Sequence, residues 1–200
     1  MEGKKYSELN MLSKQTIDFL ESIKGPFILH ISDTPTSYYA NIERLLKQIR
    51  PTLLIHTGDL ADEYKVGRIP EHLPGYREAV ARLLAIMKEN AQQVWITHGN
   101  NDDVPWLMQE KGISVFPMSG SSQVYHGLRL FLQHQPIGWL NKYEYDFALY
   151  GHGFTNDVHK PEDNRIGELC YINGVRHATI INPYNKHFCH IPYSGEEVMV

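Results

Sequence analysis

The amino-acid sequence predicts an α/β protein: a two-sheet αββα sandwich, with helices outside the sheets and an extra N-terminal helix. Two observations lead to this prediction. From residue 27 to residue 111, buried apolar strands alternate with amphipathic helices, which is typical of parallel strands joined by right-handed crossovers. After Gly112 the apolar runs are short, β-rich and separated by Gly, Asn or Pro, which indicates a second, mostly antiparallel or mixed sheet.

Length and composition favour one globular domain of 200 residues with a core of its own, since 42% of the residues are hydrophobic and 21% are charged. We expect residues 1–26 to form a helical extension and residues 27–200 a single domain. The net charge of -4 gives no electrostatic reason to expect nucleic acid as a partner, and no apolar run is long enough to cross a membrane. The cysteines, Cys170 and Cys189, form no CxxC pair, which favours reduced thiols and a cytoplasmic location. The oligomeric state is left open.

The first half of the chain has regular elements with clear ends. Apolar residues at helical spacing between Tyr6 and Lys24 predict an amphipathic helix that Gly25 and Pro26 terminate. The expected strands are 27–32, 53–56 and 93–97. The first expected helix carries Ile42, Leu45, Leu46 and Ile49 and ends at Pro51, and the other two are 76–90 and 104–111. Residues 60–75 are polar and contain Pro and Gly, so we expect a surface loop beside the site. In the second half, the expected strands are 113–116, 122–125, 128–133, 147–150, 168–172 and 178–181.

Each of the three parallel strands ends in a polar residue: Asp33, Asp59 and Asn100. The carboxyl ends of neighbouring parallel strands lie at one sheet edge, where α/β proteins bind ligands. Asp59 follows Gly58, which lets the backbone turn sharply, so its carboxylate is placed to hold a metal ion. Taken alone, Asp59 is equally well explained as a turn residue that caps the next segment.

Two strands of the second half run into histidines, His134 and His152. Either histidine alone is more simply explained as a structural residue. Together with Asp59 and Asn100 they make a mixed nitrogen and oxygen donor set. Such a set suits Mn²⁺, Fe²⁺ or Zn²⁺ better than Ca²⁺.

Five segments, in this order, resemble the motifs of the calcineurin-like metallophosphoesterase family, especially its small bacterial members. They are Ser32-Asp33-Thr34-Pro35, Gly58-Asp59, Gly99-Asn100-Asn101-Asp102, the lone His134 and Gly151-His152-Gly153-Phe154. A late Asn182-Pro183 is similar as well, so the resemblance extends from Phe27 to Pro183. It implies the metallophosphoesterase fold.

The resemblance also implies a site in which two metal ions clamp a phosphate and activate a water for in-line attack on a phosphomonoester or phosphodiester. Asp59 would bridge the ions, and Asp33 would bind the first. Asn100, His134 and His152 would join Asp59 around the second ion. The implied metal is Mn²⁺, with Fe²⁺, Zn²⁺ or Ni²⁺ as alternatives, and the implied partner is a small phosphorylated substrate.

The sequence departs from the family pattern at three positions. Pro35 stands where the family has the histidine of Asp-x-His, and Phe154 stands where it has the last histidine of Gly-His-x-His. Both losses fall on the first ion, which keeps Asp33 and the bridging Asp59. Asn101 occupies a position where many members have a histidine. It can still donate a hydrogen bond to a phosphate oxygen, but it cannot act as a general acid. The resemblance therefore implies one intact metal position and one depleted position.

Several other residues near the motifs have side chains that could replace the missing ligands, but they are better explained as structural or surface residues. They are His30, His56, His98, Asp102, Asp103, Asp157 and His159. Strand alternation directs His30 and His56 away from the site. Asp102 is expected to steady its own loop or to support a ligand histidine from behind.

We interpret the sequence as a metal-dependent phosphoesterase. The alternative is a non-catalytic binding or scaffold protein on the same fold, which the two missing histidines favour. A weaker alternative is a nucleotide phosphodiesterase in which Tyr38, Tyr39 or Tyr64 stacks on a base.

Overall fold

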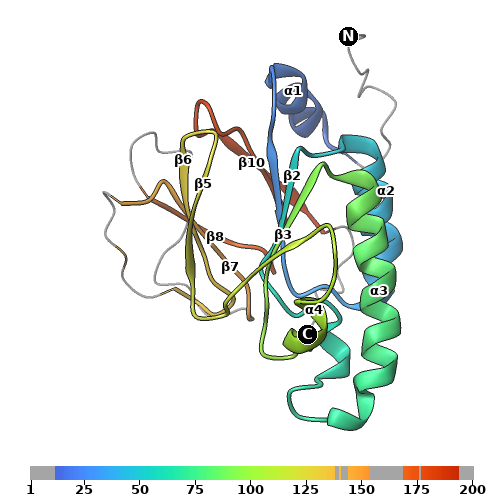
Figure 1. The fold of residues 1–200 in the computed structure, drawn as a ribbon. Coiled ribbons are helices and arrows are strands. Elements are labelled where there is room, and N and C mark those ends of the chain that lie inside the picture. The colour runs from blue at the N-terminus through green and yellow to red at the C-terminus, as the bar shows by residue number, and fades with distance from the viewer. Residues whose placement is uncertain (1–11, 138–139, 141–143, 154–168, 176, 194–200) are drawn as a thin grey trace.

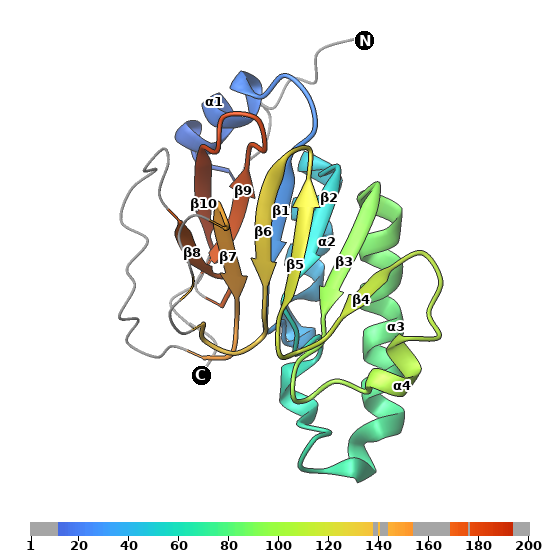
Figure 2. The same cartoon turned by 60° about the vertical axis from the view of Figure 1, so that its left-hand side comes forward.

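The structure is a computed structural model that describes residues 12–137, 140, 144–153, 169–175 and 177–193. Two sheets lie face to face, and helices α2 (Tyr39–Ile49) and α3 (Leu73–Asn90) cover the outer side of the larger sheet (Figures 1 and 2). On the outer side of the smaller sheet, Ile137 and Leu140 of a loop pack with Ala148 and Tyr150. The fold confirms the predicted α/β two-sheet architecture.

The larger sheet has six strands in the order β10-β9-β1-β2-β3-β4. Its strands are β1 (Ile28–Ile31), β2 (Leu53–His56), β3 (Gln93–Thr97), β4 (Ser114–Phe116), β9 (His177–Ile181) and β10 (Phe188–Pro192). Strands β1 to β4 are parallel, whereas β9 runs antiparallel to both β1 and β10. The carboxyl ends of β1, β2 and β3 therefore lie together at one edge of the sheet, as predicted.

The smaller sheet has the order β5-β6-β7-β8. Its strands are β5 (Ser121–Tyr125), β6 (Leu128–Leu132), β7 (Phe147–Tyr150) and β8 (Cys170–Asn173). Strand β5 is antiparallel to β6, but β6, β7 and β8 are parallel to one another. The sheet is therefore mixed, and the residues after β6 and β7 emerge at the same edge.

Two predicted strands belong to the other sheet. The segment 113–116 was expected in the second sheet, but β4 pairs with β3 and extends the first. The segment 178–181 was also expected there, but β9 pairs with β1. Strand β10 was not predicted. Apolar patterning identifies a strand but not its pairing partner, because both inner faces are equally apolar.

The helices differ from the predicted ranges mainly at their ends. Helix α1 (Lys14–Ser22) is capped by the side chain of Ser13, and residues 6–11 of the predicted helix lie outside the described part. Helix α3 begins before the predicted Tyr76 because Pro74 fits the first turn of a helix. Helix α4 (Val104–Leu107) ends before the predicted Lys111. The predicted loop contains two short 3₁₀ helices, η3 (Asp62–Tyr64) and η4 (Pro70–His72), and a third, η2 (Thr36–Tyr38), precedes α2.

Two apolar cores explain why the central strands read as continuous hydrophobic runs. Alternate residues of β1, such as Leu29 and Ile28, face the helices and the second sheet respectively. Strand β2 does the same with Leu54 and Ile55, and all four side chains are fully buried. Parallel strands covered on both faces have this pattern. The two cores fix the sheets rigidly, and the loops at their shared edge are held by that scaffold.

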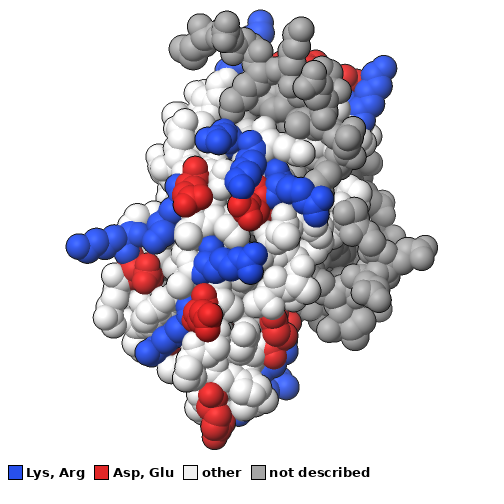
Figure 3. Space-filling model, turned by 90° about the vertical axis from the view of Figure 1, so that its right-hand side faces the viewer, with Lys and Arg blue, Asp and Glu red and all other residues white. Residues whose placement is uncertain are grey.

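The surface over α2 and α3 carries acidic and basic side chains interspersed rather than separated by sign (Figure 3). Ion pairs such as Lys47–Glu43 and Lys88–Glu110 join neighbouring charges. Among the described residues, no helix has the length and apolarity needed to span a membrane.

Candidate metal centre

Three of the predicted ligands have an unusual left-handed backbone. The φ angles are 47° at Asp33, 55° at Asp59 and 62° at His152, and these residues lie just after β1, β2 and β7. Non-glycine residues rarely adopt this conformation, which costs about 1–2 kcal/mol each. Such residues cluster at functional sites, where tight turns hold side chains in fixed directions. The strained backbone after these strands therefore fixes the directions of the three side chains, at a cost in folding free energy.

Glycines let the turns approach one another. A Cβ at Gly99 would lie 2.1 Å from Oδ1 of Asp59, and one at Gly58 would lie 2.6 Å from Nδ1 of His134. Real Cβ atoms essentially never come so close, so only a hydrogen atom fits at these positions. The glycines of the predicted motifs therefore allow the ligand side chains to converge.

Gly151 gives a direct test of this packing. A Cβ there would lie 2.0 Å from Oγ of Ser32 and 2.3 Å from Oδ2 of Asp33. We expect Gly151→Ala to displace Asp33 and weaken Mn²⁺ binding by at least about tenfold, measured by isothermal titration calorimetry. Gly127→Ala is the control for backbone strain without crowding, because its Cβ would meet nothing within 4 Å although its φ is 83°. Equal Mn²⁺ affinity in the two variants would contradict the expected crowding.

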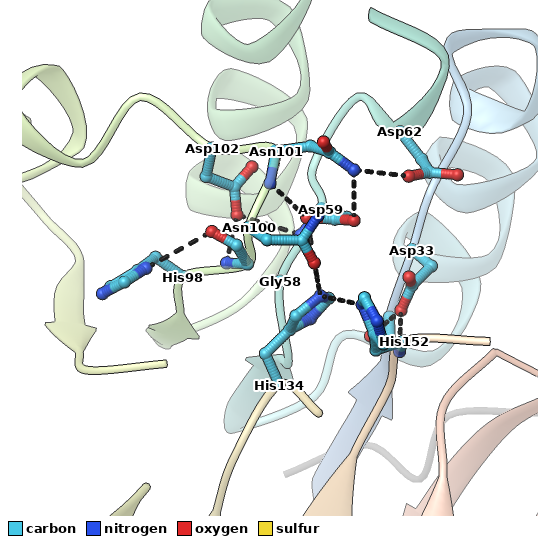
Figure 4. Close-up of polar contacts among 12 residues, drawn as sticks. Asp33, Gly58, Asp59, Asp62, His98, Asn100, Asn101, Asp102, His134 and His152 are labelled. Atoms are coloured by element: carbon cyan, nitrogen blue, oxygen red, sulfur yellow. Dashed lines mark hydrogen bonds and ion pairs between the residues drawn. The ribbon is translucent and has the colours of Figure 1, made fainter. Parts of the chain in front are cut away.

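The two histidines meet Asp59 and Asn100 at the centre of the site (Figure 4). Nε2 of His134 lies 3.1 Å from Oδ1 of Asn100, 3.0 Å from Nδ1 of His152 and 3.6 Å from Oδ1 of Asp59. His134 and Asp59 are buried, whereas His152 is partly exposed. Ligand atoms of Asp59, His134 and His152 all lie within 4.8 Å of one another. The structure thus brings the four predicted ligands of the second ion together.

The hydrogen bonds behind His134 show that this group suits a cation. Nδ1 lies 2.7 Å from the carbonyl oxygen of Thr57, which can only accept, so Nδ1 carries the proton. Nε2 then presents its lone pair to the site, where Nδ1 of His152 can donate to it in the metal-free protein and where Oδ1 of Asn100 and the Asp59 carboxylate face it. Electron pairs that face one another are stabilised by a positive ion among them. Imidazole, carboxylate and amide oxygen are a donor set that fits a transition-metal ion.

Asp33 belongs to a group of carboxylates that contains Asp59 but not the two histidines. Its Oδ2 accepts hydrogen bonds from Oγ of Ser32, at 2.5 Å, and from the backbone N–H of His152, at 3.0 Å. Its carboxylate belongs to a second group with Asp59 and Asp62, whose ligand oxygens all lie within 4.8 Å of one another. Asp59 is common to both groups, so it occupies the position that a bridging ligand needs.

Asn101 and Asp102 support Asp59 from two directions. Asn101 donates to Asp59 through its backbone N–H at 2.9 Å and through Nδ2 at 2.8 Å, and Nδ2 also lies 3.3 Å from Oδ1 of Asp62. Both amide hydrogens thus face carboxylates, so a phosphate contact requires one of them to be released. Asp102 accepts the backbone N–H groups of Asp59, Leu60 and Gly99. None of the hydrogen bonds described for Asp102 reaches a histidine.

Burial shapes the charge of the site. It raises the pKa of Asp33 to about 7, against the opposing hydrogen bonds from Ser32 and His152, and it raises the pKa of Asp59 as well. Burial and the neighbouring His134 lower the pKa of His152. The carboxyls therefore retain protons to nearly neutral pH, while His152 stays neutral and able to bind metal.

These shifts predict that metal binding depends on pH. Protons compete with metal for the carboxyls, so Mn²⁺ affinity should fall as pH drops below about 7, by up to about tenfold per unit for each competing proton. Above that pH the affinity should level off. Calorimetric titrations between about pH 5.5 and 8.5 measure the curve. A constant affinity from about pH 5.5 to 7 would contradict the prediction.

The other histidines near the motifs have structural partners, as the sequence predicts. His30 Nε2 lies 2.9 Å from Oγ1 of Thr57, and His56 Nε2 lies 3.0 Å from Oγ1 of Thr34. His98 Nε2 accepts the backbone N–H of Met118 at 3.2 Å. Pro35 has no donor atom, while Phe154, Asp157 and His159 lie outside the described residues.

Asp62 is the site residue that sequence reasoning missed. It lies three residues after Asp59, inside the segment 60–75 that the sequence predicts to be a surface loop. The left-handed turn at Asp59 and the start of η3 at Asp62 bring its carboxylate back to the site. Its spacing from Asp59 is the signal that was available, because a tight turn brings such residues close together.

Fold and site together define an α/β sandwich with candidate metal ligands at one shared sheet edge. A family model described as calcineurin-like phosphoesterase matches residues 28–180. The chain belongs to the calcineurin-like phosphoesterase family, a family of metallophosphoesterase hydrolases that typically bind divalent metals.

The solved structures that match this chain are distant from it in sequence. YfcE, a phosphoesterase from E. coli, matches with a TM-score of 0.50 and 19% identity over 83% of this chain and 98% of that chain. A second structure matches with a TM-score of 0.56 and 10% identity over 84% of this chain and 99% of the other. A protein of unknown function from Aquifex aeolicus matches with a TM-score of 0.46 and 16% identity, over 75% of this chain and 90% of its own. A search of curated proteins finds no match.

Proposed function

We propose that this protein hydrolyses a phosphomonoester or phosphodiester with the help of divalent metal ions, of which Mn²⁺ is the best candidate. The observation that carries the proposal is the convergence of lone-pair atoms from Asp59, Asn100, His134 and His152 on one small volume. Asp33 contributes to a second, poorer position beside it. A bound divalent ion would neutralise phosphate charge and lower the pKa of a coordinated water.

The residues of the chain perform the positioning. Thr57 fixes the tautomer of His134 so that Nε2 faces the site, and the backbone N–H of Asn101 holds the Asp59 carboxylate. Burial and His134 lower the pKa of His152 most, and the positive charges of Lys65 and Arg68 act in the same direction.

The test is hydrolysis of p-nitrophenyl phosphate and bis(p-nitrophenyl) phosphate with added Mn²⁺. We expect His134→Ala to lower kcat/KM by at least about 100-fold and to reduce the Mn²⁺ content of the purified protein. His126→Asn is the matched control, because His126 lies exposed in the turn between β5 and β6, at the other end of β6 from His134. Hydrolysis that is unchanged in His134→Ala would refute the proposal, and a protein that takes up no Mn²⁺ would favour the non-catalytic binding protein.

A further inference from the structure

Three carboxylates, from Asp33, Asp59 and Asp62, lie beside the two histidines (Figure 4). Each contributes one oxygen to a group whose atoms are all within 4.8 Å of one another. Asp33 and Asp59 are 8% and 2% exposed, and the Asp62 side chain is 29% exposed. When these carboxyls are ionised they repel one another, and of the three Lys65 pairs with Asp62 alone, so a cation among the three oxygens would stabilise their ionised forms.

Asn101 gives an independent indication that a ligand belongs here. The residue is 3% exposed, and its amide lies against the carboxylates of both Asp59 and Asp62. Its Oδ1 is buried and has no hydrogen-bond partner in the described part of the chain. A half-turn about the terminal torsion exchanges Nδ2 and Oδ1, which directs the oxygen between the two carboxylates. Beside ionised carboxylates, an oxygen in that position is favourable when a cation lies between it and them.

We propose that Asp33, Asp59, Asp62 and Oδ1 of Asn101 form an oxygen-only position for a hard divalent cation, Mn²⁺ or Mg²⁺. This inference rests on the metal-dependent function proposed above and names the ligands of its poorer position. In this position, Asp62 supplies a ligand in place of the two family histidines, which are Pro35 and Phe154 in this sequence. Oxygen ligands select hard cations, whereas the neighbouring position with two imidazoles also suits Zn²⁺. The two positions therefore differ in their metal preference.

Lys65 distinguishes a ligand role for Asp62 from a structural one. Its ammonium group forms an ion pair with Oδ1 of Asp62, the same oxygen that Nδ2 of Asn101 approaches. If Asp62 served only to anchor Lys65, removing either partner would have the same effect on the site. If Asp62 binds metal, Lys65 competes with the cation, and its removal leaves metal binding intact or tighter.

The experiment loads the metal-free protein with one equivalent of Zn²⁺, which outcompetes Mn²⁺ for the histidine-containing position, and then titrates Mn²⁺. Electron paramagnetic resonance of free Mn²⁺ counts the ions bound. We expect one further Mn²⁺ in the wild type, at least about tenfold weaker binding in Asp62→Asn, and binding at least as tight in Lys65→Met. Glu71→Gln is the matched control, because it removes one exposed carboxylate from the same segment. Circular dichroism verifies that each variant is folded.

The outcomes separate this inference from the proposed function. Two results would overturn the oxygen-only position: a wild type that binds one Zn²⁺ but no Mn²⁺, or an Asp62→Asn variant that binds Mn²⁺ as tightly as the wild type. Either result would still be compatible with a hydrolase that uses one metal ion. Equal weakening in Lys65→Met and Asp62→Asn overturns the ligand role in favour of a structural ion pair. A wild type that binds neither metal overturns both the inference and the proposed function.

Discussion

Replacing Asp59 by Asn is expected to lower kcat/KM for phosphate ester hydrolysis by at least about 1,000-fold. Asp59 is the one residue shared by the carboxylate and the histidine groups, so its charge contributes to both metal positions. An amide of the same shape removes that charge without leaving a cavity. Activity with saturating Mn²⁺, together with metal content, measures the effect. A decrease of only a few-fold would show that Asp59 does not bridge the two positions.

The same substitution should not destabilise the metal-free protein at pH 8. Burial raises the pKa of Asp59, so its ionised form is disfavoured in the folded state. A raised carboxyl pKa contributes stability that is present at low pH and lost as pH rises through the folded value. Asn lacks this penalty, and the unpartnered Oδ1 of Asn101 can accept from the new amide. We expect the midpoint of thermal unfolding of metal-free Asp59→Asn to equal or exceed that of the wild type, which excludes unfolding as the cause of lost activity.

The positions of Asp33, Asp59 and Asn100 could be predicted because they follow parallel strands with unmistakable apolar patterns. Strands β1 and β2 are fully buried and β3 is buried at its carboxyl end, so the residue after each one has little freedom in where it lies. The histidines after β6 and β7 required the family resemblance, since neither strand order nor sheet pairing can be read from a single strand. The close approach of His134 to Asn100 depends on how the two sheets pack.

The misplaced elements share a physical reason. Strands β4 and β9 have the apolar side chains of a strand, but their neighbours are chosen by long-range packing that the local sequence does not contain. Asp62 was missed for a related reason. Its role depends on the left-handed backbone of Asp59, a conformation that the sequence signals only through the preceding Gly58. Local patterns thus predicted elements, whereas the convergence of side chains across turns required the structure.

Asp102→Ala is expected to cause the largest loss of stability among the variants considered, about 3–5 kcal/mol. The Asp102 carboxylate accepts hydrogen bonds from three backbone N–H groups and from the hydroxyl of Tyr76, at 2.7 to 3.0 Å. These donors belong to the turns after β2 and β3 and to α3. Alanine would leave all of them without their acceptor in a partly buried setting, and an unsatisfied donor costs about 1–3 kcal/mol. Urea unfolding of the metal-free protein measures the loss.

Two graded variants show that the hydrogen bonds cause the effect. Asp102→Asn keeps one acceptor oxygen and should lose about half as much stability as Asp102→Ala, while Tyr76→Phe removes one donor and should cost only about 1 kcal/mol. Because Asp102 binds the backbone of both Asp59 and Gly99, its loss also frees the turn that directs the Asp59 carboxylate. Mn²⁺ affinity should therefore fall in the same order as stability. Equal free energies of unfolding for Asp102→Ala and Tyr76→Phe would show that the Asp102 carboxylate does not join the two turns.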